Sequence, residues 1–184
     1  MNFIMKEESV ISPLTLAIIG LVSKQPSSGY DLRKLFAETP IGAFSSSPGA
    51  VYPALKRCKA SGWIIGHVDN SKELRPREIF ELTAGGHALL KQELSRLVTQ
   101  DDVIWRSDSL ILRFSFMDGI LSDQEITDFL TQYLEEHRLY LSSLEAHRAS
   151  MPDDPRCGVL AMECGMERCR ANITWASKAL DFIQ

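Results

Sequence analysis

The chain has 184 residues, of which 45% are apolar and 24% are charged, a composition typical of a soluble globular protein. This length allows one domain with a sizeable core, or one small domain with an appended element. The apolar stretch near the start, residues 14–22, is too short to span a bilayer and lacks a small-residue cleavage pattern, so we expect a cytoplasmic protein.

Cysteine and histidine spacings argue against a metal site. The four cysteines form no CxxC pair, and His137 and His147 stand ten positions apart in one predicted helix, so the two histidines would not share a metal. The chain also lacks GxSxG, GxxxxGK[ST] and HExxH, and it has no carboxylate pair in a recognisable setting. We therefore expect reduced core thiols, no metal, no cofactor and no enzymatic activity.

Two short helices are predicted first. Apolar residues recur at helical spacing over residues 14–22 and stop at SKQPSSG. Ser28 is the expected N-cap of the next helix, GYDLRKLFAET, which ends before Pro40.

A third helix is predicted within SSSPGAVYPALKRCKASGW, with Ser47 as N-cap, Pro48 at the first helical position and Gly62 as stop signal. At about 100° per residue its inner face collects Val51, Ala54, Leu55 and Cys58. Its outer arc collects Gly49, Tyr52, Pro53, Lys56, Arg57, Lys59 and Ala60. Either these cations are simply solvated, or something negatively charged lies against them.

After Gly62 the chain predicts a hairpin and another helix. WIIGHV and REIFELT are β-branched and aromatic runs, separated by the polar segment DNSKELRP. Helical spacing returns over residues 84–98. Three helices followed by a hairpin form the winged-helix version of the helix-turn-helix, whose third helix enters the major groove of DNA.

Charge supports the same interpretation. Residues 13–98 carry 11 Lys and Arg against 7 Asp and Glu, whereas residues 99–184 carry 8 against 15. A polyanion would therefore meet the first half. The residues expected to contact DNA come from the helices and the wing: Tyr30, Ser45, Ser46, Ser47, Gly49, Tyr52, Lys56, Arg57, Lys59, Lys72, Arg75 and Arg77.

Three runs, LAIIGLVSKQPSSGYDLRKLF, SSSPGAVYPALKRCKASGWI and REIFELTAGGHALL, resemble in order and spacing the N-terminal domain of the PadR family of bacterial transcriptional regulators. The resemblance implies a homodimer whose two winged helices bind a palindromic operator, often with repression relieved by a small molecule. By that likeness Tyr30, Tyr52, Lys56, Arg75 and Arg77 would lie near DNA. The chain departs from the family in having Cys58 at a position usually held by a larger aliphatic residue, and Glu73 and Glu78 beside the wing.

The second half predicts long helices. DSLILRFSFM is a short apolar run, followed by a helix that opens with a Ser122 and Glu125 capping-box pair. A seam along this helix repeats every 3 or 4 residues, and MPDDP separates it from a last helix over about residues 158–183. The seams predict pairing with a second chain through Ile126, Leu130, Tyr133, Tyr140, Leu144, Ile173 and Leu180. The alternative is a helical hairpin within one chain. This half resembles the longer PadR subgroup, which includes activators of virulence genes.

The fold expected is therefore mainly α: a winged helix-turn-helix domain with a two-stranded wing and a short N-terminal arm over residues 1–98, and a helical dimerisation domain over residues 99–184. The function expected is a dimeric, sequence-specific DNA-binding transcriptional regulator, a repressor that responds to a small aromatic or hydrophobic effector. The aromatic residues expected to line an effector cleft, or else to pack the core, are Trp105, Phe114, Phe116 and Trp175. The alternatives are a winged-helix protein-interaction module and a transcriptional activator without an effector.

Overall fold

The computed structural model describes residues 11–39, 48–69, 76–152 and 155–183. The chain divides into two compact units, Met1–Leu94 and Ser95–Gln184. The division falls four residues before the boundary that the sequence pattern predicted after Val98. Both units consist mainly of helices.

The first two helices begin at side chains that cap them. α1 (Pro13–Lys24) follows Ser12, whose hydroxyl oxygen accepts a hydrogen bond from a backbone N–H of the first turn at 3.2 Å. α2 (Gly29–Glu38) follows Ser28, the predicted N-cap, which forms a reciprocal capping box with Asp31. These bonds satisfy N–H groups that have no carbonyl partner within the helix.

The third helix begins in two steps. A turn of 3-10 helix, η2 (Pro48–Ala50), leads into α3 (Val51–Ala60). Pro53 is therefore the third residue of the α-helix proper, where the missing N–H would have had no helical partner, so its cost is small. α3 ends at Ala60, and Gly62 follows it with a φ of 72°. The N–H groups of Gly62 and Trp63 donate to carbonyls of the last turn at 3.0 Å each and so close it.

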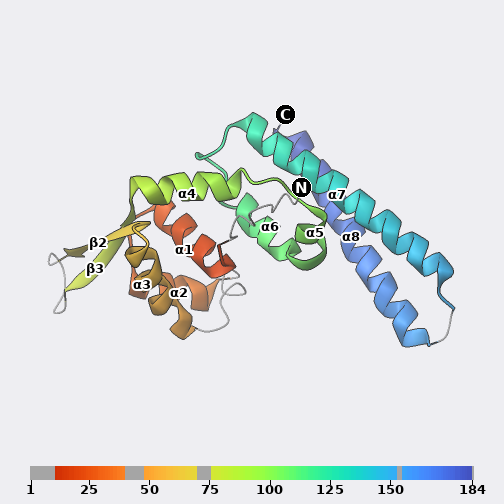
Figure 1. Cartoon of the computed structure of the whole chain (residues 1–184), viewed down its shortest axis with the longest axis horizontal. Coiled ribbons are helices and arrows are strands. Elements are labelled where there is room, and N and C mark those ends of the chain that lie inside the picture. The colour runs from red at the N-terminus through yellow and green to blue at the C-terminus, as the bar shows by residue number, and fades with distance from the viewer. Residues whose placement is uncertain (1–10, 40–47, 70–75, 153–154, 184) are drawn as a thin grey trace, which may run out of the picture. The chain divides into compact units, whose positions relative to one another are not determined.

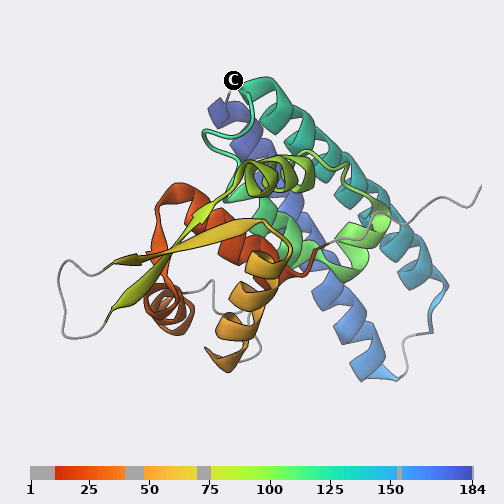
Figure 2. The ribbon, with the colours of Figure 1, turned by 60° about the vertical axis from the view of Figure 1, so that its left-hand side comes forward.

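A small antiparallel sheet completes the winged helix of the first unit. β2 (Ile64–Asp69) and β3 (Arg77–Leu82) form the predicted hairpin, and they extend beyond the helices of this unit (Figures 1 and 2). A third strand that the sequence did not predict, β1 (Ser27–Ser28), pairs with the other edge of β3, so the order is β1-β3-β2. α4 (Ala84–Leu94) follows the sheet.

The core of the first unit is built around α1, which packs against α3, β3 and α4. Five of its apolar residues are at most 4% exposed, whereas Leu14 and Leu21, which also lie within the predicted helical spacing, are half-buried. The core includes Leu16, Ala17, Ile18, Ile19, Val22, Leu32, Val51, Ala54, Leu55, Cys58, Ile64 and Leu90.

The second unit begins with two short helices, α5 (Gln100–Trp105) and α6 (Ser107–Phe114), of which the first was not predicted. α7 (Asp123–Ser150) follows Ser122 in the predicted capping box. α8 (Arg156–Ile183) then runs back along it, so that the two long helices lie side by side in both views (Figures 1 and 2).

Aromatic side chains hold α6, α7 and α8 together. The ring of Trp175 meets the rings of Phe114 and Tyr133 edge to face, with centroids 5.2 and 5.4 Å apart. Phe129 stacks on Phe114 at 6.2 Å, and the His137 ring lies 4.0 Å from that of Tyr133. Such geometries add to the stabilisation from buried area, so the core of this unit lies between its own helices.

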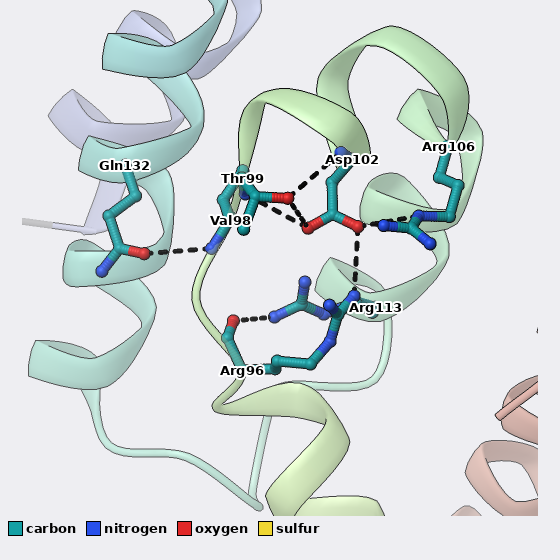
Figure 3. A network of polar contacts seen from close by, with 7 residues as sticks. All are labelled: Arg96, Val98, Thr99, Asp102, Arg106, Arg113 and Gln132. Carbon is teal, nitrogen blue, oxygen red and sulfur yellow. Dashed lines mark hydrogen bonds and ion pairs between the residues drawn. The ribbon is translucent and has the colours of Figure 1, made fainter. Parts of the chain in front are cut away.

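A buried carboxylate organises the start of the second unit (Figure 3). Asp102 is 1% exposed and accepts hydrogen bonds from the backbone N–H and hydroxyl of Thr99, at 3.1 and 2.9 Å. It also pairs with Arg96 at 3.1 Å and with Arg106 at 3.0 Å. Burial opposes ionisation of this group, but the bonds from Thr99 and the charge of Arg96 prevail and hold the pKa of Asp102 below its ordinary value.

Two further bonds tie this network to its neighbours (Figure 3). The Arg113 guanidinium donates to the carbonyl of Arg96 and lies 5.1 Å from the ring centroid of Phe129. The backbone N–H of Val98 donates to the Gln132 side chain at 3.1 Å. The segment before α5 is thereby attached to both α6 and α7.

Candidate nucleic-acid interface

An open groove of about 540 Å³ lies between α2, α3 and β3 of the first unit. Its floor is apolar, with Leu55 and Phe80 buried beneath it. Its walls and rim carry tyrosine hydroxyls and charged groups. The residues that line it are Ser28, Gly29, Tyr30, Tyr52, Leu55, Lys56, Lys59, Arg77, Glu78 and Phe80. Five of the residues predicted to contact DNA, from three separate elements, therefore share one concave surface.

The inner and outer faces of α3 divide as the sequence predicted. All four residues of the inner face are buried, and burial raises the pKa of the Cys58 thiol. Tyr52 is 52% exposed on the outer face, and Lys56 and Lys59 are exposed beside it. Arg57 is exposed as well, but it does not line the groove.

Tyr52 lies against the first turn of α2 because that turn begins with a glycine. A Cβ on Gly29 would stand 2.8 Å from Cε1 of Tyr52, closer than real side chains approach. Gly29 is buried, so the tyrosine ring covers it. The absence of a side chain at this position fixes where the tyrosine of α3 can lie.

Tyr30 joins α2 to the wing. The guanidinium carbon of Arg77, on β3, lies 5.3 Å from the centroid of the Tyr30 ring, and that of Arg33 lies 5.6 Å from it. Such cation–π contacts at exposed sites are worth about 0.5–1 kcal/mol. Two cations are thus held beside a half-exposed ring at the edge of the groove.

Lys59 is paired within the groove. Its ammonium lies 2.5 Å from Oε1 of Glu78, and both side chains remain about half exposed. From the sequence, Lys59 is an expected DNA contact and Glu78 is expected beside the wing, but no pairing between them is predicted. Alternation along β3 is the sequence signal that could have placed Glu78 in the groove, since residues 78 and 80 share one face of the strand.

The remaining predicted DNA contacts fall in other places. Gly49 is exposed in η2, one turn before the groove. Five residues lie outside the part of the chain that the structure describes: Ser45, Ser46, Ser47, Lys72 and Arg75.

The residues predicted to pair two chains lie in α7 and α8, which pack on each other within one chain. This is the intramolecular hairpin that the sequence left open as an alternative. Three of them, Ile126, Leu130 and Tyr133, are at most 5% exposed within the single chain. The other four are half-buried: Tyr140, Leu144, Ile173 and Leu180. Large apolar side chains do remain exposed on α8, at Leu160 (62%) and Phe182 (90%).

The four residues predicted to line an effector cleft are not gathered in one place. Phe114 and Trp175 meet in the aromatic core of the second unit, and Phe116 is 4% exposed. Trp105 is 79% exposed at the end of α5. None of the four lines the groove described above or the smaller cavity of the second unit.

That smaller cavity measures about 140 Å³ and lies among α5, α6, α7 and α8. His137 is 1% exposed at its wall. The Asn172 amide donates to Nε2 of the imidazole at 3.1 Å, so Nδ1 carries the proton and donates to a backbone carbonyl at 2.8 Å. Burial lowers the pKa of His137, which favours this neutral form. The lining is mixed: Val103, Ile104, Ser107, His137, Tyr140, Gly165, Arg168, Cys169 and Asn172.

Two absences hold for the described ranges, residues 11–39, 48–69, 76–152 and 155–183. No helix there is both long and apolar enough to cross a membrane. No group of three or more His, Cys, Asp and Glu side chains in these ranges is placed to hold a metal ion.

Comparison with known proteins divides the chain in two. Residues 18–92 match the Transcriptional regulator PadR-like family, and residues 108–184 match the Virulence activator alpha C-term family. The Negative transcriptional regulator PadR of Bacillus subtilis (strain 168) is 29% identical over 181 residues, which cover 92% of this chain and 97% of that protein.

Solved structures similar to this chain include crystal structures of Bacillus subtilis PadR. One is in complex with operator DNA, with 27% identity, 93% of this chain and 99% of that chain covered, and a TM-score of 0.44. Another is in complex with p-coumaric acid, with 26% identity, 93% and 98% covered, and a TM-score of 0.43.

Proposed function

We propose, because this chain belongs to the PadR-like family of transcriptional regulators, that its groove between α2, α3 and β3 is the surface that binds double-stranded DNA. As a member of that family the chain is a regulator and not an enzyme. The observation that carries this proposal is the convergence of Tyr30, Tyr52, Lys56, Lys59 and Arg77 from three elements on one concave face. Cations and hydroxyl donors on one face suit phosphate oxygens, which receive half to two-thirds of protein–DNA hydrogen bonds.

The geometry favours DNA over a protein partner. A protein-interaction surface on α3 would require an apolar outer face, whereas the outer face here carries Lys56, Arg57 and Lys59 beside Tyr52. A regulator of this kind acts on chromosomal DNA, and we therefore place it in the cytoplasm.

A homodimer is the second part of the proposal. One winged helix makes few phosphate contacts, and two of them on a palindromic site add their binding through a high effective concentration. Leu160 and Phe182 support it, because they lie about 40° apart around α8 at 100° per residue and are exposed. Sedimentation velocity should find a dimer, and a Leu160→Lys, Phe182→Lys variant should sediment as a monomer. A folded wild-type protein that stays monomeric at high concentration would remove this part of the proposal.

Repression is the direction we propose, because the Bacillus subtilis relative, 29% identical over nearly its whole length, is a negative regulator. Transcription in vitro from the promoter of the protein's own gene should fall as the protein is added. A rise would instead favour an activator.

A small-molecule effector is the last part. The mixed cavity near His137 supports it, because buried polar groups that converge on a concave site are typical of ligand sites, although 140 Å³ admits only a small molecule. Small aromatic acids should raise the melting temperature and release DNA. If none of a panel of small aromatic acids raises the melting temperature or releases DNA, the proposal of an effector is refuted.

The test of DNA binding is fluorescence anisotropy on the DNA upstream of the protein's own gene, over a salt series. A Tyr52→Ala, Lys56→Ala variant should lose tight binding, whereas Lys91→Ala, an exposed lysine on α4 away from the groove, should bind like the wild type. If the double variant binds as tightly as Lys91→Ala, or if the folded wild type binds no DNA at low salt, the groove is not a DNA site.

A further inference from the structure

We propose that Glu78 masks Lys59 from DNA, so that the groove binds nucleic acid more weakly, and with a shallower salt dependence, than its own cations would allow. This inference rests on the proposed function, because it assigns a role to a carboxylate within the same groove. Glu78 is the acidic residue among the ten that line it.

The pairing geometry is direct. Oε1 of Glu78 lies 2.5 Å from the ammonium of Lys59, which is within range of a charge-assisted hydrogen bond. The two residues come from β3 and α3, so the pair crosses the groove and does not belong to one helix. With side chains 51% and 41% exposed, the pair is in contact with water and is opened at small cost.

The neighbouring strand leaves room for the carboxylate. A Cβ on Gly66, in β2, would stand 2.2 Å from Oε1 of Glu78 and 2.7 Å from its Cδ. Gly66 is paired with Phe80, the next residue on the same face of β3. The Glu78 side chain therefore lies across β2 on its way to Lys59, and it occupies space that any other residue at position 66 would fill.

The consequence for DNA follows from charge. A phosphate that approaches the groove meets the charge of Lys56, whereas the charge of Lys59 is balanced by Glu78. For Lys59 to contact a phosphate, the ion pair must open and a carboxylate must remain near the phosphate. Phosphate neutralisation supplies essentially all non-specific binding, so masking one cation lowers the affinity for DNA of any sequence.

The experiment uses the full-length protein and a random-sequence duplex, which makes it independent of the operator. Glu78→Gln should bind about threefold to fivefold more tightly than wild type at 50 mM salt, and its plot of log affinity against log salt should be steeper by about 0.9 per winged helix. Gly66→Ala should give a similar gain, because the new Cβ displaces the carboxylate from Lys59.

Two controls separate masking from simple charge removal. Glu81→Gln removes the same charge from β3, but residue 81 is exposed and does not line the groove, so its affinity should match the wild type. In a Lys59→Gln background, Glu78→Gln should give no gain, because the cation that it would release is absent.

The outcomes are distinguishable from those of the proposed function. A folded wild type that binds no duplex at 50 mM salt refutes DNA binding itself. If the wild type binds and Glu78→Gln gains no more than Glu81→Gln, masking is refuted. A gain that persists in the Lys59→Gln background also refutes it, since Glu78 would then repel DNA without acting through Lys59.

Discussion

Replacing Asp102 by alanine should destabilise the second unit by about 2–3 kcal/mol, worked out from two contributions of its network (Figure 3). The Asp102 carboxylate supplies one half of the capping box, because it accepts hydrogen bonds from the N–H and the hydroxyl of Thr99, and loss of these bonds costs about 1 kcal/mol. The carboxylate also pairs with Arg96 and Arg106, which are 22% and 41% exposed.

The exposure of those arginines limits the second contribution. Removing one partner of a fully buried pair costs about 3–5 kcal/mol, because the other charge is left unpaired away from water. Here both guanidinium groups reach solvent, so we expect about 1–2 kcal/mol from the lost pairs. The sum is well outside the range of an ordinary surface substitution.

Urea unfolding followed by tryptophan fluorescence measures this change in one unit alone. In a Trp63→Phe background the remaining tryptophans, Trp105 and Trp175, both belong to the second unit. Asp101→Ala is the matched control, because Asp101 is exposed in the same first turn of α5. If the midpoints of the two variants give free energies of unfolding within about 0.5 kcal/mol, the network does not stabilise the unit as argued.

Three further predictions concern pH, the groove and the thiols. Folding lowers the pKa of Asp102 from 3.8, so ionised Asp102 contributes fully to the free energy of unfolding above that pH, and this contribution is lost as the pH falls through the folded pKa. The difference in the free energy of unfolding between wild type and Asp102→Asn should therefore narrow below about pH 4. Gly29→Ala should push the Tyr52 ring away and weaken binding to duplex DNA in anisotropy, with the melting temperature little changed; unchanged binding would count against Tyr52 as a contact. A thiol reagent should modify two of the four cysteines in the native protein, Cys157 and Cys164, and fast reaction of all four would contradict the burial of the others.

Local signals in the sequence were sufficient for most of the first unit. The inner face of α3 follows from helical periodicity alone, because only one stripe of that helix is apolar. Ser28 and Ser122 cap helices as predicted, since a capping box depends on residues three apart in the chain. The two-residue strand β1 has no period to detect, and it exists because β3 offers it a partner about 50 residues away.

Contacts between elements that lie far apart in the chain could not be predicted from local sequence patterns. Periodicity in α7 showed that a face is buried, but it does not say which chain buries it, and in the structure α8 of the same chain covers Leu130 and Tyr133. The six residues of α5 were not predicted, although Thr99 and Asp102 form a capping pair at its start, because the helix is too short to show a period. The cation–π contact of Tyr30 with Arg77 likewise needs the fold to bring two elements together.

The charge of the groove sets how far one winged helix can act alone. Each phosphate neutralised contributes about −0.9 to the slope of log affinity against log salt, so the two lysines of the groove, Lys56 and Lys59, would give about −1.8 per module, or about −0.9 while Glu78 masks Lys59. A dimer that places two such modules on one site doubles these values, to about −1.8 with Lys59 masked in both modules and about −3.6 without the mask. The slope therefore reports the number of engaged modules and the state of the ion pair together. Because the second unit carries the excess of acidic residues, we expect it to repel DNA, and under the proposed dimer a second winged helix on the same site would supply the further phosphate contacts.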